Sequence, residues 1–172
     1  MTAISGYAAL YNVETVIAGL FTEKIAFGAF SEALQRDDPR ALWNHDPNVV
    51  LGRKSAGTLT LSEDRKGLHY IVRLNDADPF AESVAARIAR RDVTGSSFWF
   101  AIDNPETDEE WEPGPRNGLP LRTLKRLRLL DVSPVTFPAY PTASVGVWDG
   151  RMAAQLAKVR IAIARARAWR AV

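Results

Sequence analysis

Residues 57–76, GTLTLSEDRKGLHYIVRLND, alternate between apolar and polar side chains on both sides of a short charged linker. Leu59 and Leu61 share one face before the linker, and Leu68 and Tyr70 share one face after it. Alternation with a period of two is typical of half-buried β-strands, and a short polar linker between two such runs is typical of a hairpin. The stretch therefore predicts an antiparallel hairpin with one buried face.

Similar strand patterns occur along most of the chain, and two or three segments have helical spacing instead. Strands are predicted within 5–20 with a break near Asn12, on both sides of an Asp46-Pro47 turn, from Phe98 onward, and within 126–137. Helices are predicted from about Gly28 to Pro39, over 78–92 and from Arg151. Residues 104–120 are acidic and rich in Pro and Gly, which predicts an exposed loop. Strands and helices do not alternate regularly, so we expect an α+β fold built on a β-barrel or a strongly curled, mostly antiparallel sheet flanked by helices.

The composition excludes several classes of protein. The 172 residues include 47% hydrophobic and 24% charged residues, as in ordinary globular domains, and no cysteine. Disulfides, thiolate metal sites and a cysteine nucleophile are therefore excluded. No apolar run approaches the roughly 20 residues that span a bilayer, and the N-terminus lacks the pattern of a secretory signal. We expect a protein of the cytoplasm that has no contact with a membrane.

Charge is distributed unevenly between the two ends of the chain. Residues 151–172 contain six basic residues and no acidic residue, whereas residues 1–150 contain 16 basic and 20 acidic residues, a net charge of −4. We therefore divide the chain into a domain over 1–149 and a basic amphipathic C-terminal helix or tail over 150–172. The tail is interpreted as a helix packed on the domain, as a targeting or scaffold-contact element removed on maturation, or, least favoured, as a nucleic-acid contact.

The stretch Asp92–Asp103, DVTGSSFWFAID, places two hydroxyl side chains directly before an aromatic strand. A polar turn explains Gly95 and a buried strand explains Phe98, but neither requires both Ser96 and Ser97. A serine becomes a nucleophile when a neighbouring base accepts its proton, and the base must be held in the correct tautomer by an acceptor. Small residues here would also leave backbone N–H groups free to bind an oxyanion.

A base and an acceptor can be chosen from few residues. Of the two histidines, His69 lies on the expected solvent face of its strand, and His45 lies at the end of a strand beside the predicted turn. Asp131 interrupts a strongly apolar strand, where a carboxylate needs a partner. That partner is either His45 or an arginine such as Arg128. Carboxylates and histidines have no spacing typical of a metal site, and no glycine-rich phosphate loop or dinucleotide motif occurs, so we expect no metal and no cofactor.

Six fragments, in this order between Gly6 and Val147, resemble the prohead maturation proteases of tailed bacteriophages, serine peptidases related in fold to the herpesvirus assembly protease. The fragments are GYAALYN, EKIAFGAFSEAL, ALWNHDPNVVLGR, GTLTLSEDRKGLHYIVRL, RRDVTGSSFWF and LLDVSPVTFPAYP. The resemblance implies a herpesvirus-protease-like fold. It also implies catalytic His45, Ser97 and Asp131, and it selects Ser97 over Ser96. The family often has Met, Gly and Glu where this chain has Ser96, Trp99 and Asp131.

The resemblance further implies a serine endopeptidase that cleaves scaffolding protein, or the scaffolding segment of the major capsid protein, and also itself. The cleavage would take place in the host cytoplasm, inside the immature procapsid, by a homo-oligomer. Nucleic acid is not an expected partner. The alternative is a catalytically inactive scaffold or capsid-binding module of the same fold, and the bulk of Trp99 between the two aromatic residues is the feature that keeps it open.

Overall fold

The computed structural model describes residues 2–114 and 118–148. Its strands are β1 (Ala3–Leu10), β2 (Thr15–Ile17), β3 (Phe21–Ile25), β4 (Arg40–Trp43), β5 (Asp46–Arg53), β6 (Leu59–Glu63), β7 (Gly67–Arg73), β8 (Gly95–Ala101), β9 (Glu109–Glu112), β10 (Leu121–Leu124), β11 (Arg128–Val135) and β12 (Ser144–Val147). Its helices are α1 (Ser31–Arg36), α2 (Pro79–Ala89) and α3 (Pro105–Asp108). The protein is therefore a mostly-β member of the α+β class, as the sequence predicts.

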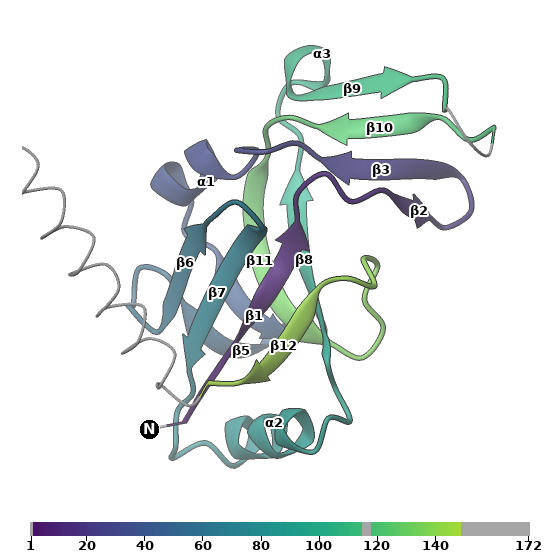
Figure 1. Ribbon diagram of the computed structural model, residues 1–172. Helices are drawn as coiled ribbons and strands as arrows, with labels where there is room; N and C mark the ends of the chain where they lie inside the picture. The colour runs from purple at the N-terminus through teal and green to yellow at the C-terminus, as the bar shows by residue number, and fades with distance from the viewer. Residues whose placement is uncertain (1, 115–117, 149–172) are drawn as a thin grey trace, which may run out of the picture.

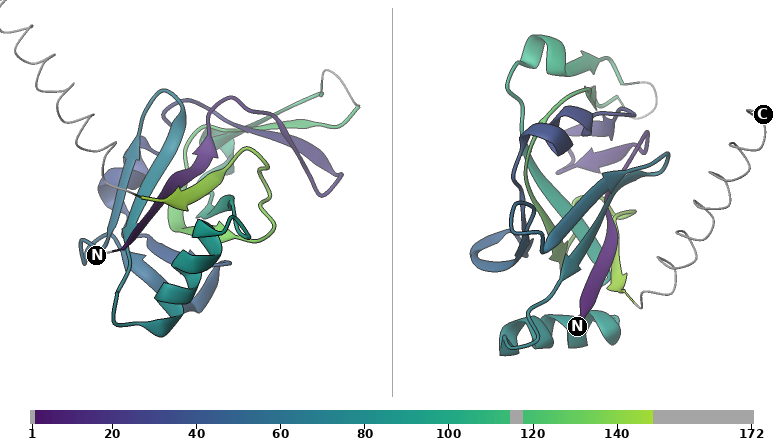
Figure 2. Two further views of the ribbon diagram at one scale, coloured as in Figure 1. Left: turned by 60° about the horizontal axis from the view of Figure 1, so that its bottom comes forward. Right: turned by 90° about the vertical axis from the view of Figure 1, so that its left-hand side faces the viewer.

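The strands form three four-stranded sheets, with the orders β12-β1-β7-β6, β2-β3-β10-β9 and β5-β4-β11-β8. All pairings among the described strands are antiparallel except β3 with β10 and β4 with β11. Figure 1 shows the β2-β3-β10-β9 sheet at one end of the molecule and α2 at the other, and Figure 2 shows the same arrangement from two further sides. Within residues 2–114 and 118–148 the sheets do not join into one closed barrel.

The hydrophobic core lies between the β12-β1-β7-β6 sheet and the β5-β4-β11-β8 sheet. Strand β1 contacts β8, and β5 contacts β7. Ile4 and Tyr70 from the first sheet and Phe98 and Val132 from the second are buried in one continuous cluster. Each such side chain contributes roughly 1.5–3 kcal/mol when it is fully buried. Because side chains alternate along a strand, the neighbours of Phe98 and Val132 point to the outer face of the second sheet.

Several local predictions are confirmed. The hairpin of residues 57–76 is β6 and β7, paired antiparallel with Leu61 opposite Tyr70. Helix α2 begins as predicted, because the Asp78 carboxylate accepts a hydrogen bond from the backbone N–H of Phe80 at 2.9 Å. The break near Asn12 is also present: β1 ends at Leu10, and Asn12 has a positive φ of 57°.

The acidic segment 104–120 is not the simple loop that its composition predicts. It forms the short helix α3 and then β9, which pairs antiparallel with β10. Opposite charges lie across this pair: Arg122 binds Glu109, and Lys125 Nζ lies 2.7 Å from a Glu110 oxygen. Ion pairs of this kind stabilise a strand in which three of the four residues are glutamates. Tertiary pairing therefore overrides the local pattern here.

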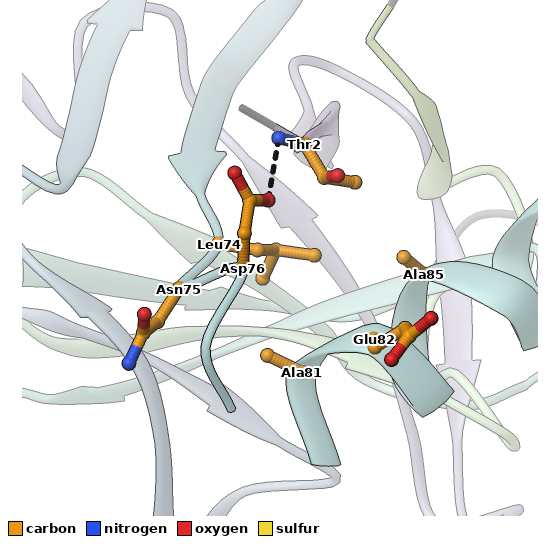
Figure 3. A pocket seen from close by; sticks show the side chains of 7 residues that line it. All are labelled: Thr2, Leu74, Asn75, Asp76, Ala81, Glu82 and Ala85. Carbon is orange, nitrogen blue, oxygen red and sulfur yellow. Dashed lines mark hydrogen bonds between the residues drawn. The ribbon is translucent and has the colours of Figure 1, made fainter. Parts of the chain in front are cut away.

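Thr2, the residue before β1, is attached to the segment that leads from β7 into α2. A depression of about 220 Å³ lies at this place. Figure 3 shows its lining residues, with Ala81, Glu82 and Ala85 of α2 on one side. The backbone N–H of Thr2 donates a hydrogen bond to Asp76 at 2.9 Å, and this contact lowers the pKa of the Asp76 carboxyl. The described chain ends beside this strand, where the N–H of Trp148 donates to the carbonyl of Ala3 at 2.8 Å. The predicted segment 150–172 lies outside the described residues.

His69 is not as exposed as its strand position predicts. Its ring lies 5.1 Å from that of Tyr7 and 6.4 Å from that of Trp148, and it is half-buried between them. Burial lowers the pKa of His69 from its ordinary 6.5, and the nearby ammonium of Lys66 adds to this effect, while the carboxylate of Asp64 opposes it.

This depressed pKa predicts a pH-dependent contribution to stability. The unfolded chain binds a proton at His69 more readily than the folded protein, so the free energy of unfolding falls as the pH drops through about 6.5. In His69→Phe, which keeps an aromatic ring but cannot bind a proton, this part of the slope should disappear. Urea unfolding of both proteins at several pH values between about 5 and 8 measures the difference. Equal slopes for the two proteins would contradict the prediction.

Candidate active site

The hairpin that joins β4 to β5 places His45. Trp43 pairs with Asp46, so the connecting loop contains two residues, Asn44 and His45, with φ values of 52° and 59°. Two-residue hairpin loops of the type I′ class have positive φ at both positions, and Asn is well suited to the first of them. The turn therefore lies two residues earlier than the predicted Asp46-Pro47 turn, because Asp46 is already the first residue of β5. A histidine in this left-handed region is uncommon and needs support from its surroundings.

That support comes from the end of β11. The N–H of Asn44 donates to the carbonyl of Pro134 at 3.0 Å, and the Asn44 side-chain oxygen accepts a hydrogen bond from the N–H of Thr136 at 2.9 Å. The N–H of His45 donates to the hydroxyl of Ser133 at 3.3 Å. These contacts fix the hairpin over the outer face of the sheet, with the imidazole held in place.

Asp131 lies in the middle of β11 and is the partner of His45. Its Oδ1 is 2.7 Å from Nδ1 of the imidazole, and its side chain is only 2% exposed. The alternative partner, Arg128, binds Asp103 instead, at 3.3 Å. The other oxygen, Oδ2, is buried and has no hydrogen-bond partner among the described residues. A buried carboxylate beside Nδ1 favours the tautomer that carries its proton there, which leaves Nε2 free to accept one.

Ser96 and Ser97 lie within β8, not in a turn before it, because the strand begins at Gly95. Side chains at adjacent positions in a strand point to opposite faces. Ser96 points into the core, where its hydroxyl is 2.6 Å from the Tyr70 hydroxyl and donates to the carbonyl of Ser144 at 3.0 Å. Ser97 therefore points to the opposite, outer face of the sheet.

The outer face is also the face of the His45–Asp131 pair. In the antiparallel pairing of β8 with β11, Ser97 is opposite Ser133, and Trp99 is opposite Asp131. Directly opposed residues have Cβ atoms about 4.5–5.5 Å apart. Ser97 as a whole residue is 6% exposed, and no hydrogen bond between Ser97 and His45 forms within the described part of the chain. In enzymes without substrate such contacts are often long and tighten on binding.

Gly95 keeps the start of β8 accessible to the segment that follows β11. A Cβ atom at Gly95 would lie 2.8 Å from Cγ of Pro138, closer than side chains approach one another. Only glycine therefore allows this loop to pack on the strand two residues before Ser97. Phe137, the residue before Pro138, is 91% exposed.

Ser133 is a further member of the site and is not among the residues predicted from the sequence. It is fully buried, and its hydroxyl donates to Asp131 Oδ1 at 2.8 Å while accepting the N–H of His45. The sequence contains a pattern that indicates this role, because Asp131 and Ser133 are two residues apart in a predicted strand and so share a face. The same hydroxyl positions both the carboxylate and the backbone of the histidine.

Ser133→Ala is expected to lower kcat roughly tenfold with little change in KM. A lost hydrogen bond to a charged group costs about 1.5–3 kcal/mol, and part of this cost raises the free energy of the transition state. The variant is compared with Ser96→Ala, which removes a buried hydroxyl from the opposite face of the neighbouring strand. Initial rates of turnover at several substrate concentrations give both constants. An unchanged kcat in Ser133→Ala, or an equal loss in Ser96→Ala, would contradict this role.

The described residues contain no group of three or more His, Cys, Asp or Glu side chains that could hold a metal ion. In the same residues, no helix is both long enough and apolar enough to cross a bilayer. The site therefore consists of a histidine, a carboxylate and two hydroxyls on one face of a sheet. This set of groups is suited to nucleophilic acyl transfer.

The fold of this protein is similar to that of a herpesvirus protease. A solved structure of KSHV (herpesvirus) protease, in complex with a hexapeptide phosphonate inhibitor, superposes with a TM-score of 0.54 at 10% sequence identity. The match covers 86% of this chain and 64% of that chain, so this chain spans less than two thirds of its structural relative. A comparison with curated protein sequences finds no significant match.

The family follows from the sequence itself. Residues 1–158 match the model of the caudovirus prohead serine protease family. The chain belongs to this family of serine peptidases, whose members act in capsid maturation of tailed bacteriophages. The predicted family resemblance and the herpesvirus-protease-like fold are both confirmed.

Proposed function

We propose that this protein is a serine endopeptidase of procapsid maturation in which Ser97 is the nucleophile, His45 the general base and Asp131 the residue that orients the imidazole. The observation that carries the proposal is the 2.7 Å contact between His45 Nδ1 and Asp131 Oδ1, on the sheet face to which Ser97 points. Family membership supports the same reaction class.

In the proposed reaction the Ser97 oxygen attacks the carbonyl carbon of the scissile peptide bond, and its proton moves to Nε2 of His45. The carboxylate of Asp131 stabilises the imidazolium through the proton on Nδ1. His45 then gives its Nε2 proton to the leaving amine, and the C–N bond breaks to leave an acyl-serine ester. A water molecule, deprotonated by the same imidazole, hydrolyses the ester and restores the serine hydroxyl.

The proposed substrates are scaffolding protein or the scaffolding segment of the major capsid protein, together with the protease itself. Cleavage would take place inside the immature procapsid in the host cytoplasm, with a homo-oligomer as the working form. The support for this proposal is the family, whose name refers to the prohead. No metal or cofactor enters the proposed chemistry. The three side chains supply the nucleophile, the base and the negative charge that stabilises the imidazolium.

Co-expression with the capsid or scaffolding protein encoded beside it tests the proposal. Intact-mass measurement of the co-expressed partner, with and without the protease, should show two fragments whose masses sum to that of the partner plus one water. Cleavage that depends on the protease supports an endopeptidase. A partner that co-purifies with this chain but stays intact would instead indicate the inactive capsid-binding module.

A further inference from the structure

Beside the His45–Asp131 pair, the outer face of the β5-β4-β11-β8 sheet contains a depression of about 350 Å³. Its lining includes Arg40 and Leu42 of β4, Pro47 and Val50 of β5, Trp99 of β8 and Asp131 of β11. All four strands of the sheet therefore contribute to it. The volume lies within the range of about 300–1,000 Å³ that is usual for ligand pockets.

We propose that this depression is the subsite that receives a large apolar side chain of the peptide substrate. This inference rests on the proposed function. The depression is continuous with the candidate active site, because Asp131 belongs to both, and Trp99 is two residues from Ser97 along β8. Two residues of strand span about 7 Å, which is also the reach of two residues of an extended substrate. The occupant is therefore a residue within about two positions of the scissile bond.

The lining determines the chemistry of the occupant. Trp99 and Val50 are 54% and 53% exposed, and they face the depression together with the apolar side chains of Leu42 and Pro47. Large apolar side chains exposed in a concave surface mark a binding site. A peptide side chain of the Leu, Met or Phe type would cover them.

The two charged residues of the lining do not favour a charged occupant. The Arg40 guanidinium donates to the carbonyl of Asp38 at 2.5 Å and lies 3.8 Å from the Asp38 carboxylate, which also binds Arg53 at 2.6 Å, so part of the Arg40 charge is compensated there. The Asp131 carboxylate is engaged by His45 and Ser133 through Oδ1. An apolar occupant would also exclude water from the buried Asp131 and so strengthen its interaction with His45.

Val50→Trp fills the depression at an exposed position, and Val16→Trp is the matched control. Val16 is a comparably exposed valine, at 50%, in β2 of a different sheet. Each protein digests a diverse peptide mixture, and mass spectrometry gives the residue preference at each position around the cleaved bonds. A small organophosphorus reagent that carries no peptide side chain measures the reactivity of Ser97 separately.

Wild type and Val16→Trp should prefer large apolar residues at one position within two residues of the cleaved bond. Val50→Trp should lose about 10–200-fold in kcat/KM for those peptides, the range for apolar pocket contacts. It should then favour Ala or Gly at that position and react with the reagent at an unchanged rate.

Normal labelling with an unchanged preference in Val50→Trp would overturn the subsite but leave the proposed function standing. An unchanged preference combined with loss of cleavage of the folded capsid or scaffolding partner would also overturn it, and would make the depression a docking surface. No labelling of Ser97 in wild type would overturn both proposals.

Discussion

Ser97→Ala is expected to abolish cleavage of the capsid or scaffolding partner. The substitution removes the attacking oxygen and leaves the rest of the site in place, and loss of the nucleophile in a serine protease costs on the order of 10⁴–10⁶ in kcat. Time courses of cleavage, followed by intact mass, measure the effect. The variant should keep its folded structure, since the Ser97 hydroxyl forms no hydrogen bond within the described part of the chain.

Ser96→Ala is the matched control for this experiment. The neighbouring hydroxyl contacts Tyr70 and the carbonyl of Ser144 on the core side of the strand. Its removal should lower the free energy of unfolding by about 1–3 kcal/mol, because a buried tyrosine hydroxyl loses its partner, and should leave cleavage measurable. Loss of cleavage in Ser96→Ala with retention in Ser97→Ala would reverse the assignment of the two serines.

Asp131→Asn is expected to lower kcat by about 10⁴, the effect of the equivalent change in a Ser-His-Asp site. The amide would present an N–H group to Nδ1 of His45, or a neutral oxygen in place of a carboxylate. Either change destabilises the tautomer of His45 that leaves Nε2 free to accept the serine proton. Cleavage rates measure the loss, and the midpoint of thermal unfolding shows whether the variant remains folded.

Asp108→Asn provides the control for a buried Asp-to-Asn change elsewhere in the molecule. The Asp108 side chain, at the last residue of α3, is also nearly inaccessible and binds Arg126 at 2.8 Å. This variant should lose stability without a comparable loss of kcat. If Asp131→Asn kept more than about a tenth of the wild-type rate, the carboxylate would have a structural role only.

The parts of the fold that local patterns determine were predictable from the sequence. The hairpin of β6 and β7 follows from alternation, and α2 follows from its apolar spacing and the Asp78 cap. Strand β9 was not predictable, because three of its four residues are glutamates and it exists through pairing with β10. Strand β12 was missed for a similar reason: four residues after a proline-rich segment become a strand only by pairing with β1.

The candidate site was predictable to the extent that chemistry restricts the residue types. The chain has only two histidines, and Asp131 lies inside an apolar strand. The pairing of His45 with Asp131 could therefore be anticipated, and the contact is present. The position of the turn at Asn44-His45 and the placement of Gly95–Ser97 inside a strand depend on register, which a single sequence does not reveal. The depression beside Asp131 needed the structure, because four strands line it.

The most direct test of the central claim is covalent labelling of the native protein by a serine-directed organophosphorus reagent, followed by peptide mapping. We expect one adduct, on Ser97, that is absent in Ser97→Ala and whose formation is strongly slowed in His45→Ala. Ser96→Ala should label like wild type. No adduct on folded wild-type protein, or an adduct that persists at another residue in Ser97→Ala while the partner is still cleaved, would contradict the assignment of Ser97 as a nucleophile activated by His45 and Asp131.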